Sequence, residues 1–205
     1  MFKNYIFDFG QVIVKFDTKY MTSVYISDQE DICLVEKVVF DRIYWDKLDA
    51  GTITDEEVKE GIKSRLPERL QVKACTVYDN WYHNLPFVDG IQELICKIKS
   101  KGGRLFLLSN ISKGFAGNYI HISKIKELFD MFDGLVFSAP IGMTKPSKEI
   151  FNYVINKYNL KADETVFIDD NENNILGAQN AGLSAFLFNC DSVKALEDYI
   201  FQGEI

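Results

Sequence analysis

Three short apolar runs of this 205-residue chain lead into side chains that can ligate a cation or polarise a substrate. These side chains are Asp8 in the run 5–9, Ser109 and Asn110 after the run 104–108, and Asp169 and Asp170 after the run 165–168. The carboxyl ends of parallel strands meet at one edge of a sheet, which is where open α/β sheets bind ligands. We therefore expect these side chains to converge on one site.

The acidic members of this set predict a bound metal ion. Neighbouring carboxylates repel one another unless a proton or a cation lies between them. Oxygen ligands in a polar cleft suit a hard ion, and Mg²⁺ is the cofactor that we expect. Lys145, which precedes Pro146, adds a positive charge to the set. A hydroxyl, a lysine and a metal ion together suit a phosphoryl group.

The elements that must position these residues alternate, from residue 86 onward, between β-rich runs and segments with helical apolar spacing. This alternation predicts an α/β fold with a Rossmann-like parallel sheet and helices on both faces. We expect strands at 5–9, 104–108, 135–138, 165–168 and 184–188. We expect a helix from an Asp89 cap to Gly102, a second helix at 146–159 with Pro146 in its first turn, and two more at 171–181 and 192–201.

Residues 16–85 have a different character, because they lack strand runs and are rich in charge. Leu34, Val38 and Tyr44 are spaced as the buried positions of helices, and Thr54 to Glu57 form a capping box. Short helices need packing partners, so we expect a small bundle. The predicted organisation is a core of residues 1–15 and 86–205 with an inserted helical cap at 16–85.

The composition limits the partners of the chain. Its net charge of −7 argues against a nucleic-acid partner, whose phosphates are bound mainly by Lys and Arg. No apolar run approaches the ~20 residues that span a bilayer, and we expect no membrane partner and a cytoplasmic location. Four cysteines without a Cys-x-x-Cys pair are expected to be buried, reduced thiols: Cys33, Cys75, Cys96 and Cys190. The oligomeric state is not predicted.

Four segments of the chain resemble, in order, the motifs of the haloacid dehalogenase superfamily. They are Ile6 to Val14, Phe106 to Asn110, Lys145-Pro146, and Phe167 to Asn174 followed by Gly177 and Gly182. The resemblance covers essentially the whole chain and implies a magnesium-dependent phosphohydrolase. The helical insert after the first motif is similar to the helical cap of this superfamily.

The resemblance implies a role for each residue of the site. Asp8 is the nucleophile that becomes an aspartyl phosphate. The metal ligands are Asp8, the carbonyl group of Gly10, Asp170 as the main carboxylate of the fourth motif, and Asp169. The phosphate is bound by Ser109, Asn110 and Lys145, and Asn174 occupies a position that is often held by an acid.

Gly10 departs from the pattern of the superfamily, whose phosphatases mostly carry an aspartate here as general acid and base. Such help is typically worth about 10²–10⁴ in rate. Sequences with Asp-x-Gly at this point resemble a branch that includes sugar-phosphate phosphatases, so we expect a small phosphorylated metabolite such as a sugar phosphate. Trp45 and Asp49, with Asp46 and Gly51, lie where related caps place a loop over the active site. Substrate contact and cap packing both remain open for them.

Four other functions stay open at this stage. A haloacid dehalogenase shares the nucleophile but needs no metal, which makes the paired carboxylates Asp169 and Asp170 costly. A phosphomutase relies on the aspartate that Gly10 replaces. A phosphorylated receiver module uses the same residue types, but there the acid pair precedes the acceptor aspartate. A catalytically weak regulatory or binding homologue is compatible with Gly10.

Overall fold

A five-stranded parallel sheet with the strand order β3-β2-β1-β4-β5 forms the centre of the protein. The computed structural model describes residues 2–190 and 192–202. The strands are β1 (Asn4–Phe7), β2 (Arg104–Ser109), β3 (Gly134–Phe137), β4 (Thr165–Asp169) and β5 (Ser184–Leu187). Each neighbouring pair is parallel, which confirms the predicted fold class. Because β1 lies between β2 and β4, the three strands that carry the candidate site residues are adjacent.

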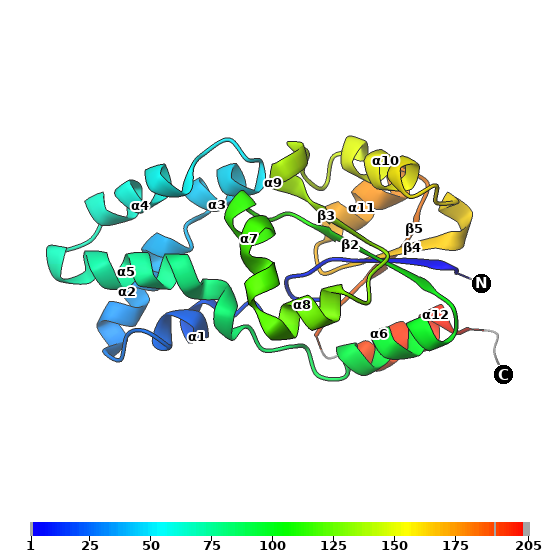
Figure 1. Cartoon of the computed structure of the whole chain (residues 1–205), viewed down its shortest axis with the longest axis horizontal. Helices are drawn as coiled ribbons and strands as arrows, with labels where there is room; N and C mark the ends of the chain where they lie inside the picture. Colours follow the sequence, from blue (N-terminus) through cyan, green and yellow to red (C-terminus); the bar gives the residue numbers. More distant parts are fainter. Residues whose placement is uncertain (1, 191, 203–205) are drawn as a thin grey trace.

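Helices cover both faces of the sheet (Figure 1). On one face, Phe7 and Leu107 belong to the same buried cluster as residues of α6, α8 and α12. On the other face, Ile6 and Phe106 are clustered with residues of α10 and α11. The bounds of these helices are α6 Ile91–Ser100, α8 Ser123–Phe129, α12 Val193–Ile200, α10 Lys148–Lys157 and α11 Glu172–Asn180. Since successive strand side chains point to opposite faces, the double cover explains why the strands are apolar throughout.

Short elements fill the connections between these layers. They are α7 (Lys113–Asn118), α9 (Ser138–Ile141) and the 3₁₀ turns η1 (Trp81–Asn84), η2 (Tyr119–His121) and η3 (Ala162–Glu164). No element was predicted for residues 111–134, which contain α7, η2 and α8. Among the described residues, no helix combines the length and the apolar character needed to cross a membrane.

Two helix starts differ from the prediction. Asp89 does not cap α6, because the N-cap residue is Gly90, with φ of 81° and no side-chain cap. The Asp89 carboxylate instead accepts a hydrogen bond from Lys15 Nζ at 2.8 Å. Pro146 lies outside α10, whose N-cap residue is Ser147 and whose first residue is Lys148.

The residues between β1 and α6 form a helical insert with a buried cluster of its own. Its helices are α1 (Thr18–Ser23), α2 (Gln29–Val39), α3 (Arg42–Asp49), α4 (Asp55–Ser64) and α5 (Glu68–Asn80). Figure 1 shows them gathered on the side of the molecule away from the chain termini. The capping box of Thr54 and Glu57 is present, and Val38 and Tyr44 are buried as predicted. Leu34 was expected in this core but is 37% exposed, because it lies on the outer face of α2.

The predicted burial of the cysteines was wrong, since none of the four side chains is fully buried. Cys33 and Cys96 are exposed, and Cys75 and Cys190 are half-buried. Cys33 and Cys96 each follow a buried isoleucine in a helix, Ile32 and Ile95. Consecutive helical residues point about 100° apart, so an apolar neighbour in sequence does not place a cysteine on the buried face.

Candidate active site

A cleft with a volume of about 420 Å³ lies between the carboxyl ends of β1, β2 and β4 and the helical insert. The site residues predicted from the sequence that line it are Asp8, Gly10, Trp45, Asp49, Ser109, Asn110, Lys145, Asp170 and Asn174. Asp169 is fully buried at the end of β4. The structure therefore brings together residues that are up to 166 positions apart, as the register of β1 with β2 and β4 requires.

Lys145 links the nucleophile candidate to the fourth motif. Its Nζ atom lies 2.8 Å from Oδ1 of Asp8 and 2.7 Å from Oδ2 of Asp169, and its side chain is 1% exposed. Burial disfavours the charged ammonium group, but the two carboxylates outweigh this effect and raise the pKa of Lys145. The lysine is therefore a fixed positive charge beside Asp8.

The Asp8 carboxyl is held in a mixed electrostatic environment. Burial, helped by the neighbouring charge of Asp169, raises the pKa of Asp8 to about 7 against the opposing effect of Lys145. A cation bound at this carboxyl favours its ionised form, which is the form that a nucleophile needs.

Asp169 is a positioning residue for its neighbours. Its Oδ1 atom accepts hydrogen bonds from the backbone N–H of Asn171 and from Nδ2 of Asn174, both at 2.9 Å. Its Oδ2 atom accepts from Lys145 at 2.7 Å and from the same Asn174 amide at 3.1 Å. Both oxygens thus accept hydrogen bonds, and the Asn174 amide can donate to Asp169 where an ionised carboxylate could not.

The donor set suits a hard divalent cation. Asp8, Asp169 and Asp170 each offer a carboxylate oxygen, and these atoms lie within 4.8 Å of one another. Because the oxygens of Asp169 already accept hydrogen bonds, Asp8 and the exposed Asp170 are the carboxylates best placed to hold the ion. An all-oxygen set of this kind fits Mg²⁺.

Asn110 contacts the backbone of Lys145 through both ends of its amide. Its Nδ2 atom donates to the Lys145 carbonyl oxygen at 2.9 Å, and its Oδ1 atom accepts from the Lys145 N–H at 2.8 Å. A phosphate contact was predicted for Asn110, but its side chain is engaged in holding Lys145. Ser109, the last residue of β2, is 2% exposed at the floor of the cleft.

Residues 3–182 match the sequence family of haloacid dehalogenase-like hydrolases. The chain belongs to this family. The resemblance drawn from the four motifs is thereby confirmed, and the cleft at the strand ends coincides with those motifs.

Several relatives within this hydrolase family carry assigned activities. A sesquiterpene phosphatase from Aspergillus oryzae is 26% identical over 89% of this chain and 87% of its own length. The D-ribitol-5-phosphate phosphatase of Bacteroides thetaiotaomicron is 27% identical over 91% of each chain. A solved HAD family enzyme from Bacteroides thetaiotaomicron, in complex with magnesium and inorganic phosphate, has the same fold with a TM-score of 0.69. Its sequence is 22% identical, and the match covers 98% of this chain and 100% of that one.

The helical insert gives this hydrolase an aromatic wall. Trp45 packs against Phe16, Phe40 and Trp81 with ring centroids 5.7, 5.5 and 5.1 Å apart, and its indole N–H donates to the Val39 carbonyl oxygen. All four rings also line the cleft. Trp45 therefore both packs within the insert and borders the site, so the two interpretations from the sequence are compatible.

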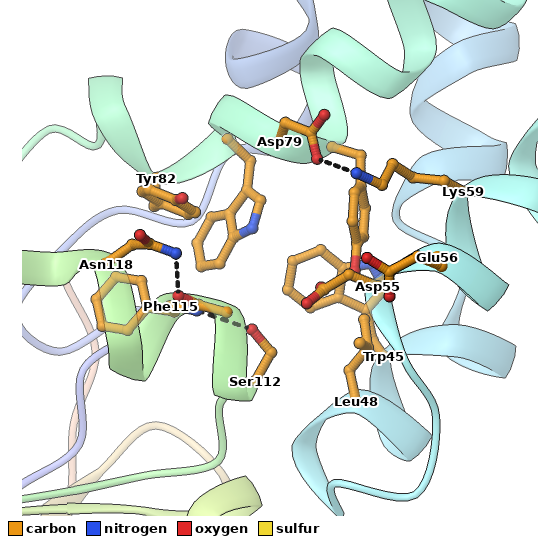
Figure 2. A pocket seen from close by; sticks show the side chains of 13 residues that line it. Trp45, Leu48, Asp55, Glu56, Lys59, Asp79, Tyr82, Ser112, Phe115 and Asn118 are labelled. Atoms are coloured by element: carbon orange, nitrogen blue, oxygen red, sulfur yellow. Dashed lines mark hydrogen bonds and ion pairs between the residues drawn. The ribbon is translucent and has the colours of Figure 1, made fainter.

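A second cavity of about 190 Å³ lies between the insert and α7 (Figure 2). Trp45 and Trp81 line this cavity as well as the cleft, so the two indoles form the partition between them. Figure 2 shows the ion pair of Lys59 with Asp79 at its edge, with a distance of 3.1 Å. The cleft is thus bordered on this side by aromatic side chains.

Several residues that line the cleft had no role predicted from the sequence. They are Gln11, Phe16, Phe40, Arg42, Trp81, Ile111, Pro146, Asn171 and Asn173. Arg42 is the first residue of α3, and no motif marked it. Its position could be found only by knowing how the insert is placed over the sheet.

Proposed function

We propose that the protein is a magnesium-dependent phosphohydrolase that acts on a small phosphorylated metabolite through an aspartyl-phosphate intermediate at Asp8. The observation that carries this proposal is the position of Lys145, whose Nζ atom lies between Asp8 and Asp169 beside the exposed residue Asp170. A fixed cation and a divalent metal site next to one carboxylate suit phosphoryl transfer.

Nucleophilic attack and stabilisation of the phosphoryl oxygens each have residues to perform them. An oxygen of Asp8 attacks phosphorus as the bond to the leaving-group oxygen breaks, and water then cleaves the aspartyl phosphate to release inorganic phosphate. Lys145 offsets the negative charge that builds up on the phosphoryl oxygens, and the Ser109 hydroxyl donates to one of them. Asp8, the Gly10 carbonyl and Asp170, with Asp169 beside them, would hold Mg²⁺, which when bound would supply further positive charge at the phosphoryl group.

A sugar phosphate is the substrate class that we propose. The cleft of about 420 Å³ combines hydrogen-bonding groups, such as those of Arg42, Asn173 and Asp49, with the aromatic wall. Polar groups that converge beside aromatic rings suit a small polyol. The activity of the ribitol-phosphate relative supports this class. In this proposal residues 16–85 act as the cap, and residues 1–15 with 86–205 form the catalytic core.

A catalytically weak regulatory homologue is the second candidate, and the observation that favours it is Gly10. A metal-independent dehalogenase fits less well, because Lys145 supplies one positive charge against the three clustered carboxylates of Asp8, Asp169 and Asp170. A phosphomutase and a receiver module fit less well for the reasons given by the sequence.

A phosphate-release screen tests the proposal. Purified protein is incubated with sugar phosphates, nucleotides, acyl phosphates and an activated aryl phosphate, with Mg²⁺ or with EDTA. We expect release that depends on Mg²⁺ and that is lost in Asp8→Asn but kept in Asp89→Asn, whose carboxylate is 93% exposed. Magnesium binding without release from any of these compounds would favour the regulatory homologue.

A further inference from the structure

We infer that Asp49 is the proton donor to the leaving group and the base for water in this hydrolase. The inference rests on the proposed phosphohydrolase function and concerns the step for which Gly10 leaves no side chain. It assigns the acid–base role to the helical insert and not to the first motif.

The side chains around the cleft leave few other candidates. Among the described lining residues, the carboxyl groups are those of Asp8, Asp49 and Asp170, and none of these residues is a His, Cys, Glu or Tyr. Asp8 is the nucleophile and Asp170 is the metal ligand, so neither is available for proton transfer. Lys145 contacts two carboxylates, and a guanidinium such as that of Arg42 does not release a proton in proteins.

Asp49 is held over the catalytic core by contacts of its own backbone. It is the last residue of α3, and its carbonyl oxygen accepts a hydrogen bond from Ser138 Oγ at 2.6 Å. Two residues later, Gly51 has a φ of 69°, and a Cβ atom there would lie 2.6 Å from the carbonyl oxygen of Ala139. This close approach fixes the end of α3 against α9, so Asp49 has a defined position at the cleft.

The protonation state of Asp49 suits the role. Burial raises the pKa of Asp49 to about 7, with Asp46 acting in the same direction and Arg42 and Lys145 acting in the opposite one. A catalytic acid is most effective when its pKa lies near the working pH, because both protonation states are then accessible. The neutral acid is thus populated in the resting enzyme at neutral pH.

The space beside Gly10 leaves room for this geometry. A Cβ atom built on Gly10 would meet no heavy atom within 4 Å. The leaving group and the attacking water can occupy that space in turn, with the carboxyl group of Asp49 on the insert side of the cleft.

Asp49 loses one proton in the first step and regains one in the second. As Asp8 forms its bond to phosphorus, the P–O bond to the leaving group breaks, and the Asp49 carboxyl proton moves to the departing oxygen. The Asp49 carboxylate then accepts a proton from water as the water oxygen attacks phosphorus and the bond to Asp8 breaks. Asp49 is protonated again, and the products are the alcohol and inorganic phosphate.

The test compares substrates with poor and good leaving groups. With an alkyl phosphate, Asp49→Asn should lower kcat/KM about 10²–10⁴-fold, because an alkoxide leaves poorly without a proton. With p-nitrophenyl phosphate the loss should stay below about tenfold, since that leaving group needs no acid. The matched control is Asp79→Asn, an exposed aspartate of the same insert that pairs with Lys59, and it should leave both substrates unchanged.

Two further measurements make the outcome decisive. Gly10→Asp in the Asp49→Asn background should restore alkyl phosphate turnover at least tenfold. In the wild-type enzyme, kcat for the alkyl phosphate should fall as the pH rises through about 7, whereas kcat for the aryl phosphate should not. This comparison needs no variant, so it remains valid if Asp49→Asn fails to fold.

The outcomes separate this inference from the proposed function. Equal losses on both substrates, or no loss on either, would overturn the role of Asp49 while the wild-type enzyme remains a phosphatase. The same fall in kcat at high pH for the alkyl and the aryl phosphate would also overturn the role of Asp49. Absence of phosphate release from both substrates by the wild-type protein would instead reject the phosphohydrolase proposal.

Discussion

The Nζ atom of Lys145 lies 2.7 Å from Oδ2 of Asp169, and neither side chain has more than 1% of its surface exposed. A buried ion pair of this kind contributes little net stability when complete, but removing one partner leaves an uncompensated charge. The pair therefore fixes the position of the lysine at Asp8 while making the fold sensitive to its loss.

Asp169→Asn should be strongly destabilising for this reason. We expect a loss of about 3–5 kcal/mol in the free energy of unfolding, measured with urea, together with a large fall in kcat. Asp79→Asn, which breaks the exposed pair with Lys59, should cost less than about 1 kcal/mol. Similar small changes in the two variants would show that the buried pair does not have the assigned importance.

Asn110→Ala tests whether this side chain positions Lys145 or binds phosphate. The substitution removes both hydrogen bonds to the Lys145 backbone. We expect kcat to fall about tenfold or more with little change in KM, because a displaced lysine weakens stabilisation of the transition state more than substrate binding. A rise in KM at constant kcat would instead indicate direct contact with the substrate phosphate.

Gly51→Ala tests the contact that holds the end of α3. Gly51 has a φ of 69° and no room for a Cβ atom against Ala139, whereas Gly102 has a φ of 82° and open space. Both alanine variants incur the cost of a left-handed backbone, about 1 kcal/mol, but only Gly51→Ala must also displace the insert. We expect a larger drop in Tm and a lower kcat for Gly51→Ala. Equal Tm values and unchanged kcat in both variants would contradict the contact.

The stability of the metal-free protein should depend on the charge of Asp49. The pKa of this carboxyl is raised from an ordinary 3.8 to about 7, so the folded state binds its proton more tightly than the unfolded state. The contribution of Asp49 to stability is therefore lost as the pH rises from about 4 through about 7.

Asp49→Asn removes this dependence, and its Tm should exceed that of the wild-type protein at pH 8 by a few degrees. The difference should narrow at pH 5, where the wild-type carboxyl is protonated. In a chain of this size 1 kcal/mol corresponds to about 2–4 °C, so calorimetry with EDTA resolves the effect. A difference in Tm that is the same at both pH values would show that Asp49 does not titrate as described.

The sequence was sufficient to predict the positions of the site residues that lie at strand ends. Asp8, Ser109 and Asp169 are fixed by the sheet, because apolar runs predict strands and parallel strands bring their carboxyl ends together. Lys145 could be added because the third motif accompanies the other three.

The sequence did not predict the position of a residue where that position depends on packing between distant elements. Arg42 and Trp81 reach the cleft only because the insert folds over the sheet, and no local pattern encodes that placement. Asp89 looked like a helix cap, but its partner is Lys15 from a segment 74 residues earlier. The exposure of Cys33 and Leu34 depends on which face of α2 packs inward, which its mixed sequence did not determine.

Trapping of the phosphorylated enzyme tests the central claim most directly. The wild-type protein is mixed with an activated aryl phosphate and Mg²⁺, quenched with acid during turnover, and analysed by peptide mass spectrometry. We predict one phosphoryl group on the peptide that contains Asp8, labile to hydroxylamine as an acyl phosphate, and none in Asp8→Asn. Phosphate release at an undiminished rate by Asp8→Asn, or a trapped phosphoryl group on another residue, would contradict the account.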